Sequence, residues 1–441
     1  MSPPKWFGRG WTLPHGSQLC RRDCIPRPVK AAGLNLLQRP VATRTTPPPQ
    51  PTRSSRTPLS FPATFVRGGT SNGLVITRSC LPPATTAQDE VAQWQPILSS
   101  AMGSPDPTGR QLDGLGSGIS STSKVCVIEP SSRPDVDVEY TFVQVGIRDG
   151  RLDAAGNCGN MSSAVGPVAL EEGLVPPGCV VEGGEGTGLV AKVRMLNRNT
   201  AKLIEATFDV EVGEGSGRAR YQPAGAYAID GVPGTGSRIM LSFLDPAGSK
   251  TGRALPTGNG VDELRLPDGS SVQASLVDVA NPGVFVLAKD VGLRGEERPE
   301  TIEAESALME RLEEIRRAGA TAMELNPDVQ SIPKIVMLSP PSERLREQGV
   351  NIVCRALSMQ QAHKAAPLTL ALNLGAACRM PGTLPAMAAV DAEGKESVVI
   401  AHASGKLEVG SVMQDGQIKR ALLHRTARVM MKGEVSYSLK S

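Results

Sequence analysis

The feature that most limits the fold of this chain is the way its apolar residues are grouped after Phe61. They form short runs interrupted by Gly, Pro, Asp and Asn, and few of them continue into helical stretches. Eleven runs have the length and β-branched character of strands. Because many are joined by short turn-like links, we expect mainly antiparallel pairing. The predicted strands are Thr64–Val66, Leu74–Thr77, Lys124–Ile128, Val136–Val145, Ile204–Val212, Ile239–Phe243, Ser271–Val277, Val284–Leu287, Ile335–Leu338, Asn351–Leu357 and Glu396–Ile400.

Three stretches have the apolar period of an α-helix. The clearest is Ile302–Ala318, and Gly319 follows it as a predicted C-terminal stop. A second spans about Asn160–Glu172, with Gly173 as its stop, and a third spans about Lys364–Cys378. Each half of the chain therefore shows several strands and a central helix, which predicts an α+β fold with a weak structural duplication.

The first 60 residues differ from the rest. They contain ten Lys and Arg, one acidic residue and eleven prolines. Such a segment cannot bury enough apolar surface to fold, so we expect a disordered basic tail. Its Arg-rich, acid-poor composition is typical of an organelle transit peptide and predicts a mitochondrial location. The alternative is a plain disordered tail on a cytoplasmic protein.

The remaining residues suggest a small-molecule partner rather than nucleic acid or membrane. The net charge of +3 comes from the basic tail, and the rest has an acidic excess without a basic patch. No run approaches the roughly 18 apolar residues that span a bilayer. The eight cysteines lack paired C-x-x-C spacing, and the four histidines lack nearby partner ligands. Neither a disulfide framework nor a metal site is expected.

The cluster Asn157-Cys158-Gly159-Asn160 stands at the start of the second predicted helix. Unpaired backbone N–H groups and the helix dipole lower the pKa of a cysteine there and also bind a carboxylate. The alternative is a small buried apolar residue, which is the commonest role of a free cysteine. The cluster indicates carbon-acid chemistry on an acidic metabolite.

Other polar clusters have the composition of anion sites. Arg67 precedes two glycines and Ser71, which suits bidentate binding of a carboxylate, although a tight turn explains the same residues. Ser123-Lys124 closes a glycine-rich loop, but the order of a P-loop is missing and a strand follows, which disfavours nucleotide binding. Thr257 and Asn281 lie in second-half turns and are expected to line the opposite wall.

Together these clusters resemble the PrpF family, the 2-methylaconitate cis–trans isomerase group that includes aconitate Δ-isomerases and oxalomesaconate tautomerases. The resemblance covers roughly residues 61–441, in order. It rests on Val66-Arg67-Gly68-Gly69-Thr70-Ser71, Gly103-Ser104-Pro105-Asp106-Pro107, Ser121-Thr122-Ser123-Lys124, Gly156-Asn157-Cys158-Gly159-Asn160, Phe243-Leu244-Asp245-Pro246, Leu255-Pro256-Thr257-Gly258-Asn259 and Arg425-Thr426-Ala427-Arg428.

The resemblance implies a diaminopimelate-epimerase-like fold. Two lobes each have a curled, mainly antiparallel sheet around a central helix, and the active site lies between them. Glycine and proline clusters near 231–236 predict the hinge. We therefore expect an N-terminal lobe over 61–235, a C-terminal lobe over 236–423, and a segment 424–441 that returns to the first lobe. The resemblance also implies no metal and no organic cofactor.

The implied activity is isomerisation, by a double-bond shift or cis–trans change, of an unsaturated di- or tricarboxylic acid of the aconitate or methylaconitate type. Proton removal beside the conjugated system forms a dienolate, which needs cationic or N–H stabilisation. By the resemblance, Lys124 and Cys158 are the proton-transfer groups on either side of the substrate. The residues expected to bind it are Arg67, Ser71, Ser123, Asn157, Gly159, Asn160, Thr257 and Asn281.

The sequence departs from the family at several places. Asn72 replaces a basic residue, and Pro167 falls inside the second predicted helix, where it removes a backbone hydrogen bond at a cost of about 3 kcal/mol. The second half lacks the paired cysteine of true epimerases, since Cys378 stands in another context. An amino-acid epimerase is thus disfavoured. A catalytically idle carboxylate-binding paralogue, or an accessory protein to a dehydratase, is the alternative function. A homodimer is left open.

Overall fold

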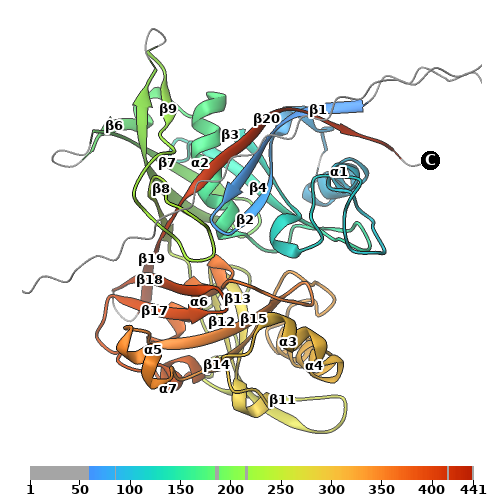
Figure 1. Ribbon diagram of the computed structural model, residues 1–441, viewed down its shortest axis with the longest axis vertical. Helices are drawn as coiled ribbons and strands as arrows, with labels where there is room; N and C mark the ends of the chain where they lie inside the picture. The colour runs from blue at the N-terminus through green and yellow to red at the C-terminus, as the bar shows by residue number, and fades with distance from the viewer. Residues whose placement is uncertain (1–58, 85, 184–187, 214–216, 415–416, 440–441) are drawn as a thin grey trace, which may run out of the picture. The chain divides into compact units, whose positions relative to one another are not determined.

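The computed structural model describes residues 59–84, 86–183, 188–213, 217–414 and 417–439 (Figure 1). The predicted basic tail lies outside these residues apart from its last two positions. Thr57–Ser441 clusters as one compact unit, and the division into two lobes near residue 235 stays a prediction. No helix of the described segments is long and apolar enough to cross a membrane.

Most of the regular structure is strand. The helices are α1 (Ala87–Met102), α2 (Gly159–Glu172), α3 (Pro299–Ala304), α4 (Ser306–Ala322), α5 (Glu343–Glu347), α6 (Leu368–Ala377) and α7 (Leu384–Ala388). The strands are β1 (Leu59–Gly68), β2 (Ser71–Thr77), β3 (Lys124–Pro130), β4 (Val138–Val145), β5 (Leu152–Asp153), β6 (Val180–Glu182), β7 (Leu189–Asn197), β8 (Lys202–Val212), β9 (Ala219–Tyr221), β10 (Ile239–Leu244), β11 (Asp262–Arg265), β12 (Ser271–Val279), β13 (Asn281–Leu287), β14 (Lys334–Ser339), β15 (Ile352–Ser358), β16 (Gln361–Ala362), β17 (Ser397–His402), β18 (Gly405–Gln414), β19 (Gln417–Arg425) and β20 (Ala427–Tyr437).

Hydrogen-bonded pairing joins the strands into one continuous path. Its order is β20-β1-β2-β3-β4-β7-β8-β10-β19-β18-β17-β15-β14-β13-β12-β11. The pairs β2–β3, β4–β7, β13–β14 and β15–β17 are parallel, and the others in this path are antiparallel. The prediction of mainly antiparallel pairing is confirmed. The last strand, β20, lies along β1 (Figure 1).

The same unit of structure occurs twice. The elements shared by the two repeats are, in chain order, β2-α1-β3-β4-β5-α2-β7-β8 in the first and β13-α4-β14-β15-β16-α6-β17-β18 in the second. The first repeat also contains β6, and the second also contains α3, α5 and α7. In both repeats a helix links the first parallel pair of strands and a second helix links the next parallel pair. A parallel pair needs such a crossover, because its strands cannot be joined by a tight turn. The duplication that the sequence suggested is therefore present at the level of topology.

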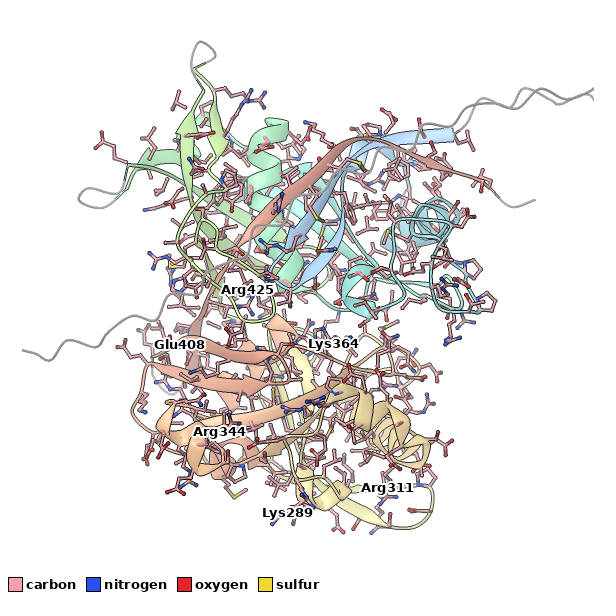
Figure 2. The ribbon with its side chains drawn as sticks, viewed as in Figure 1. Lys289, Arg311, Arg344, Lys364, Glu408 and Arg425 are labelled. Atoms are coloured by element: carbon pink, nitrogen blue, oxygen red, sulfur yellow. The ribbon has the colours of Figure 1, made fainter. Side chains whose placement is uncertain are left out.

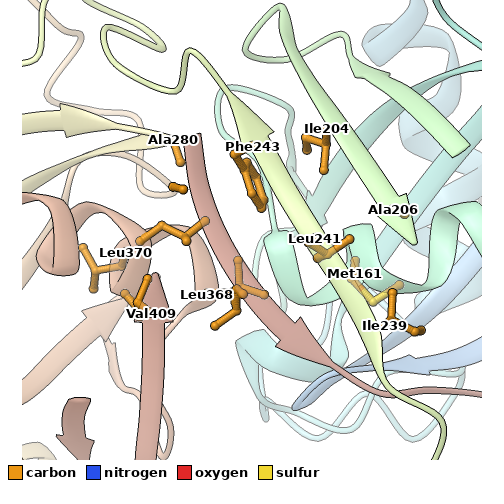
Figure 3. Packing of buried hydrophobic residues seen from close by; sticks show 14 of the residues in the cluster. Met161, Ile204, Ala206, Ile239, Leu241, Phe243, Ala280, Leu368, Leu370 and Val409 are labelled. Carbon is orange, nitrogen blue, oxygen red and sulfur yellow. The ribbon is translucent and has the colours of Figure 1, made fainter. Parts of the chain in front are cut away.

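Each repeat surrounds its second helix with strands. Helix α2 contacts β1, β2, β3, β4, β7, β8, β9 and β20, and α6 contacts β12, β13, β17, β18 and β19. Every residue of α6 is buried, as is α2 from Gly159 to Leu170. A helix that is apolar on all sides is stable only when strands cover it completely. Met161 of α2 and Leu368 of α6 belong to one buried cluster (Figure 3).

The predicted helix Ile302–Ala318 is two helices, α3 and α4, separated at Glu305. The prediction that Gly319 stops it is wrong, because α4 continues to Ala322 and Gly319 is buried within it. A Cβ atom at Gly319 would lie 2.4 Å from a methyl carbon of Val284. This glycine therefore allows α4 to approach β13 closely.

The second predicted helix is confirmed as α2. It continues through Pro167 and ends at Gly173, whose φ of 71° is the left-handed conformation of a glycine C-cap. The third predicted helix begins at Leu368 rather than near Lys364, because Pro367 disfavours helical geometry in the residue before it. Helix α1, which contains Pro96, was not predicted, and neither were the strands β7, β18, β19 and β20.

Candidate active site

One cavity collects polar side chains from both repeats. The first repeat contributes the starts of β2, β3 and α2 together with part of β4, and the second contributes the start of β14, the end of β15 and the segment leading into α6. The lining residues are Ser71, Lys124, Phe142, Gln144, Gly156, Asn157, Cys158, Gly159, Asn160, Ser331, Lys334, Ser358, His363, Pro367, Leu368 and Thr369.

Cys158 is the N-cap residue of α2. No side chain caps this helix, so the N–H groups of its first turn are left for a ligand, in a position where the helix dipole favours an anion. The Sγ atom of Cys158 lies 4.0 Å from the hydroxyl oxygen of Ser71. A Cβ atom at Gly159 would lie 2.2 Å from Leu368, so glycine allows the start of α6 to approach.

Lys124 is the first residue of β3 and is buried. Its ammonium donates to Oε1 of Gln144, and its Nζ atom lies 5.2 Å from the centre of the Phe142 ring. Gln144 is held in place because its amide donates to two backbone carbonyls, those of Ser120 and Ser123. Burial lowers the pKa of Lys124, because a low-dielectric environment disfavours the charged amine.

Lys334 is a site residue that the sequence reasoning missed. It is the first residue of β14, it is buried, and its ammonium donates to the carbonyl of Ser331. Burial, and then the positive charge of Lys124, lower its pKa to about 8. The signal in the sequence is weak, since one lysine before an apolar strand is usually solvated. It becomes informative once the two repeats are aligned.

Neither lysine forms an ion pair with a carboxylate of the described segments, although the negative charge of Asp153 acts on both of them. Among the residues that the structure describes, ion pairs of lysine occur at Lys364, Lys419 and Lys432, and none involves Lys124 or Lys334. A buried cation without a counter-ion is unfavourable unless it loses its proton or binds an anion. The cavity therefore has the electrostatics of a site for an acidic ligand.

His363 also lines the cavity and is neutral at physiological pH. Burial, and then the charge of Lys124, lower its pKa to about 3. Its Nδ1 atom accepts the backbone N–H of Ala365 at 3.1 Å, which leaves the proton on Nε2. The ring is thus a neutral hydrogen-bond donor rather than a base.

The two asparagines of the predicted cluster are held by the protein. The side-chain oxygen of Asn157 accepts from the Tyr140 hydroxyl at 3.2 Å. The side chain of Asn160 donates to Thr70 and accepts from Nε of Arg425, the last residue of β19 (Figure 2). Burial lowers the pKa of Arg425 to about 10. Both asparagines therefore shape the loop, and the groups left for a ligand are mainly backbone N–H groups.

Six of the ten predicted site residues line this cavity: Ser71, Lys124, Asn157, Cys158, Gly159 and Asn160. Arg67 lines a neighbouring cavity together with Asn72, and its guanidinium donates to the carbonyls of Gly69 and Thr426. Ser123 is fully buried, and its hydroxyl donates to Val145. The structure thus gives Arg67 and Ser123 roles in shaping the backbone around the site.

The remaining two predicted residues lie outside the cavity lining. The hydroxyl of Thr257 donates to Asp262, five residues along the chain and 2.8 Å away, and Thr257 does not line the cavity that contains Lys124. Asn281 is fully engaged at the site's edge: its Oδ1 accepts the backbone N–H of Asn157, and its amide donates to the Asn157 carbonyl and to Thr369. Asn281 therefore holds the Cys158 loop against the second repeat.

No group of three or more His, Cys, Asp and Glu side chains in the described segments is arranged to hold a metal ion. Cys378, one of the two cysteines of the second repeat, stands at the C-terminal end of α6, and burial raises its pKa. It is therefore at the opposite end of its helix from the position of Cys158 in α2.

Comparison with known proteins identifies close similarity over the described chain. The model of the PrpF protein family matches residues 59–438. A 3-methylitaconate isomerase of Eubacterium barkeri is 37% identical over 392 residues, which cover 86% of this chain and 97% of the relative. A 2-methyl-aconitate isomerase of Cupriavidus necator is 36% identical and covers 86% and 97%. The crystal structure of a methylitaconate-delta-isomerase superposes with a TM-score of 0.65 at 36% identity, covering 87% and 96%.

Proposed function

This chain belongs to the PrpF family, and we propose that it is a cofactor-independent isomerase that shifts, or isomerises between cis and trans, a C=C bond in an unsaturated di- or tricarboxylic acid of the aconitate or methylaconitate type. The two repeats are the cores of two diaminopimelate-epimerase-like lobes, and the cavity between them is the active site. The observation that carries the proposal is the pair of buried lysines, neither of which forms an ion pair with a carboxylate within the described segments. A polycarboxylate supplies the missing negative charge.

In this proposal Lys124 is the base. Burial favours its neutral amine, which removes a proton from the carbon next to the conjugated system. The electron pair of the broken C–H bond enters a dienolate, which a remaining ammonium and the N–H groups of α2 stabilise. Cys158 lines the same cavity and, in this first assignment, hands a proton back. The start of α2 holds one substrate carboxylate, and Ser71 is a further anchor.

Proton NMR in heavy water tests this function directly. The protein is incubated with cis-aconitate, trans-aconitate or methylaconitate, and each hydrogen position is followed with time. We expect deuterium at the allylic carbon and appearance of the isomer for at least one acid. Binding without exchange or isomerisation would favour the idle carboxylate-binding paralogue. In a parallel incubation with an L-amino acid, deuterium at the α-carbon would favour an epimerase.

The pH dependence of kcat/KM should report the lysines. The mechanism needs one lysine of the pair as a neutral amine and the other as an ammonium, and the pKa of Lys334 is about 8. We therefore expect kcat/KM to rise with pH as the first proton leaves the pair near pH 8, and to fall again at higher pH when the second ammonium is lost. Below about pH 8 it should fall about tenfold for each pH unit. The two lysines titrate as a coupled pair, so the apparent pKa belongs to both. A profile that instead rises near pH 6 would contradict the lysine assignment. His363 would not explain such a rise, because its pKa is about 3.

A further inference from the structure

The two lysines of the cavity occupy the same place in the two repeats. Lys124 begins β3 and pairs with Gly73 of the parallel strand β2, while Lys334 begins β14 and pairs with Gly283 of the parallel strand β13. In both repeats the paired glycine is the third residue of its strand. Two side chains that start equivalent strands, and that line one cavity, approach a ligand from different repeats.

The cysteine position is not duplicated in this way. Cys158 is the N-cap residue of α2, and the residue in the same place at α6 is Pro367, which has no titratable hydrogen. Thus the first residue of β3 and the equivalent first residue of β14 are both acid–base groups. Of the two equivalent N-cap positions, that of α2 has an acid–base group and that of α6 does not. The pair of groups that can exchange protons from two sides is Lys124 and Lys334.

The surroundings of Lys334 leave it available to a ligand. Its ammonium has three N–H groups, and the structure assigns one acceptor, the carbonyl of Ser331. The backbone and the hydroxyl of Ser331 donate to Asp153 of the first repeat at 3.0 and 2.7 Å, so this carboxylate holds the Ser331 segment. The charged and titratable groups that act on Lys334 are Lys124, Cys158, Asp153 and Arg316.

We propose that Lys334 is a second acid–base residue of this site and that it exchanges a proton at the opposite end of the substrate's three-carbon allylic unit from Lys124. The proposal rests on the proposed isomerase function and deepens it, because it assigns the return of the proton to Lys334 in place of Cys158. In one direction the amine of Lys124 takes a proton as the C–H bond breaks, and the electron pair passes into the dienolate. The ammonium of Lys334 then gives its proton to the other end of the unit, a new C–H bond forms, and the double bond has moved.

At the end of this step Lys124 is an ammonium and Lys334 is a neutral amine. No oxidant, reductant or further reactant is needed. In the reverse direction Lys334 is the base and Lys124 the acid. In this scheme Cys158 contacts a substrate carboxylate and does not donate the second proton. The equivalent position in the second repeat, Pro367, has no acid–base group.

The test uses Lys124→Gln and Lys334→Gln in heavy water, starting from each of the two double-bond isomers in turn. Both variants should lose isomerisation, by roughly 10²- to 10⁴-fold. Lys334→Gln should still exchange the hydrogen of the isomer that Lys124 deprotonates, and it should not exchange that of the other isomer. Lys124→Gln should show the reverse pattern. Lys250→Gln is the matched control, because Lys250 is a half-buried lysine that donates to Asn199 outside the cavity.

Full activity of Lys334→Gln would overturn the proposal. So would a parallel loss of both exchanges with a raised KM, since that pattern identifies a residue that binds the substrate. If a variant fails to fold, a measurement on the wild-type protein still tests the proposal. Substrate deuterated at the allylic carbon is converted in a single turnover in ordinary water. If one lysine removes the deuteron and the other donates a proton, the product contains no deuterium, and any deuterium in the product would overturn the proposal. Failure of the proposed function is distinct, because the wild-type protein would then show neither exchange nor isomerisation.

Discussion

Replacing Lys124 with methionine is expected to lower kcat for isomerisation by at least about 10²- to 10⁴-fold, the usual contribution of a positioned acid–base group. Methionine fills similar space but removes the amine that abstracts the proton. The environment of the side chain is already suited to an apolar chain, because Lys124 is buried against the ring of Phe142. The loss should therefore appear in the chemical step rather than in folding.

The stability of this variant should change little. Removing a buried ammonium favours the fold, but methionine leaves the buried Oε1 atom of Gln144 without its donor, at a cost of about 1–3 kcal/mol. We expect the free energy of unfolding in urea to stay close to that of the wild-type protein. Lys202→Met is the matched control, since Lys202 donates to the carbonyls of Asp245 and Ala247 away from the cavity and should keep full activity when replaced. A fully active Lys124→Met protein would contradict the role of Lys124.

Replacing Asn281 with alanine is expected to reduce both stability and activity. The Asn281 side chain is the partner of the N–H and the carbonyl of Asn157, at 3.1 and 2.8 Å, and it also donates to Thr369. Each buried polar group left without a partner costs about 1–3 kcal/mol. Because Asn157 directly precedes Cys158, a shift of the loop displaces the start of α2. A displacement of about 1 Å near reacting groups can cost 10²-fold in rate.

The control for this variant is Asn351→Ala. Asn351 is similarly buried and makes three hydrogen bonds to the backbone of Val390, Asp391 and Val399, none of which lines the cavity. We expect both variants to unfold at lower urea concentration, while Asn281→Ala alone loses kcat/KM in the folded protein. Equal activity losses after correction for the folded fraction would show that Asn281 acts through stability and does not position the site.

Local sequence patterns predicted most of the elements. Each of the eleven predicted strands overlaps an observed one, because alternating or continuous apolar runs between turn residues have few other ways to bury their side chains. The patterns failed where a local rule met a tertiary contact. Gly319 continues a helix because it packs against Val284, and Pro96 lies inside α1 although proline usually ends a helix.

Local sequence motifs also predicted part of the site. Ser71, Lys124 and Cys158 stand in motifs whose residues are adjacent in the sequence, so a single sequence and a family resemblance were enough to select them. Thr257 was selected by its motif as well, yet its turn bonds to Asp262 and lies outside the cavity. Asn281 was taken for a ligand-binding residue, and the structure shows all its side-chain hydrogen bonds directed at the protein around Asn157 and Thr369.

The sequence by itself determined eleven of the strands, the α2 helix and the polar motifs that contain Lys124 and Cys158, since these depend on neighbouring residues. The tertiary structure alone decided that Lys334 belongs to the same cavity. Lys124 and Lys334 are separated by more than 200 residues, and their meeting depends on the register of β2 with β3 and of β13 with β14. Register is set by which side chains the whole sheet buries, and a one-residue slip would turn either lysine to the other face. No local pattern carries that information.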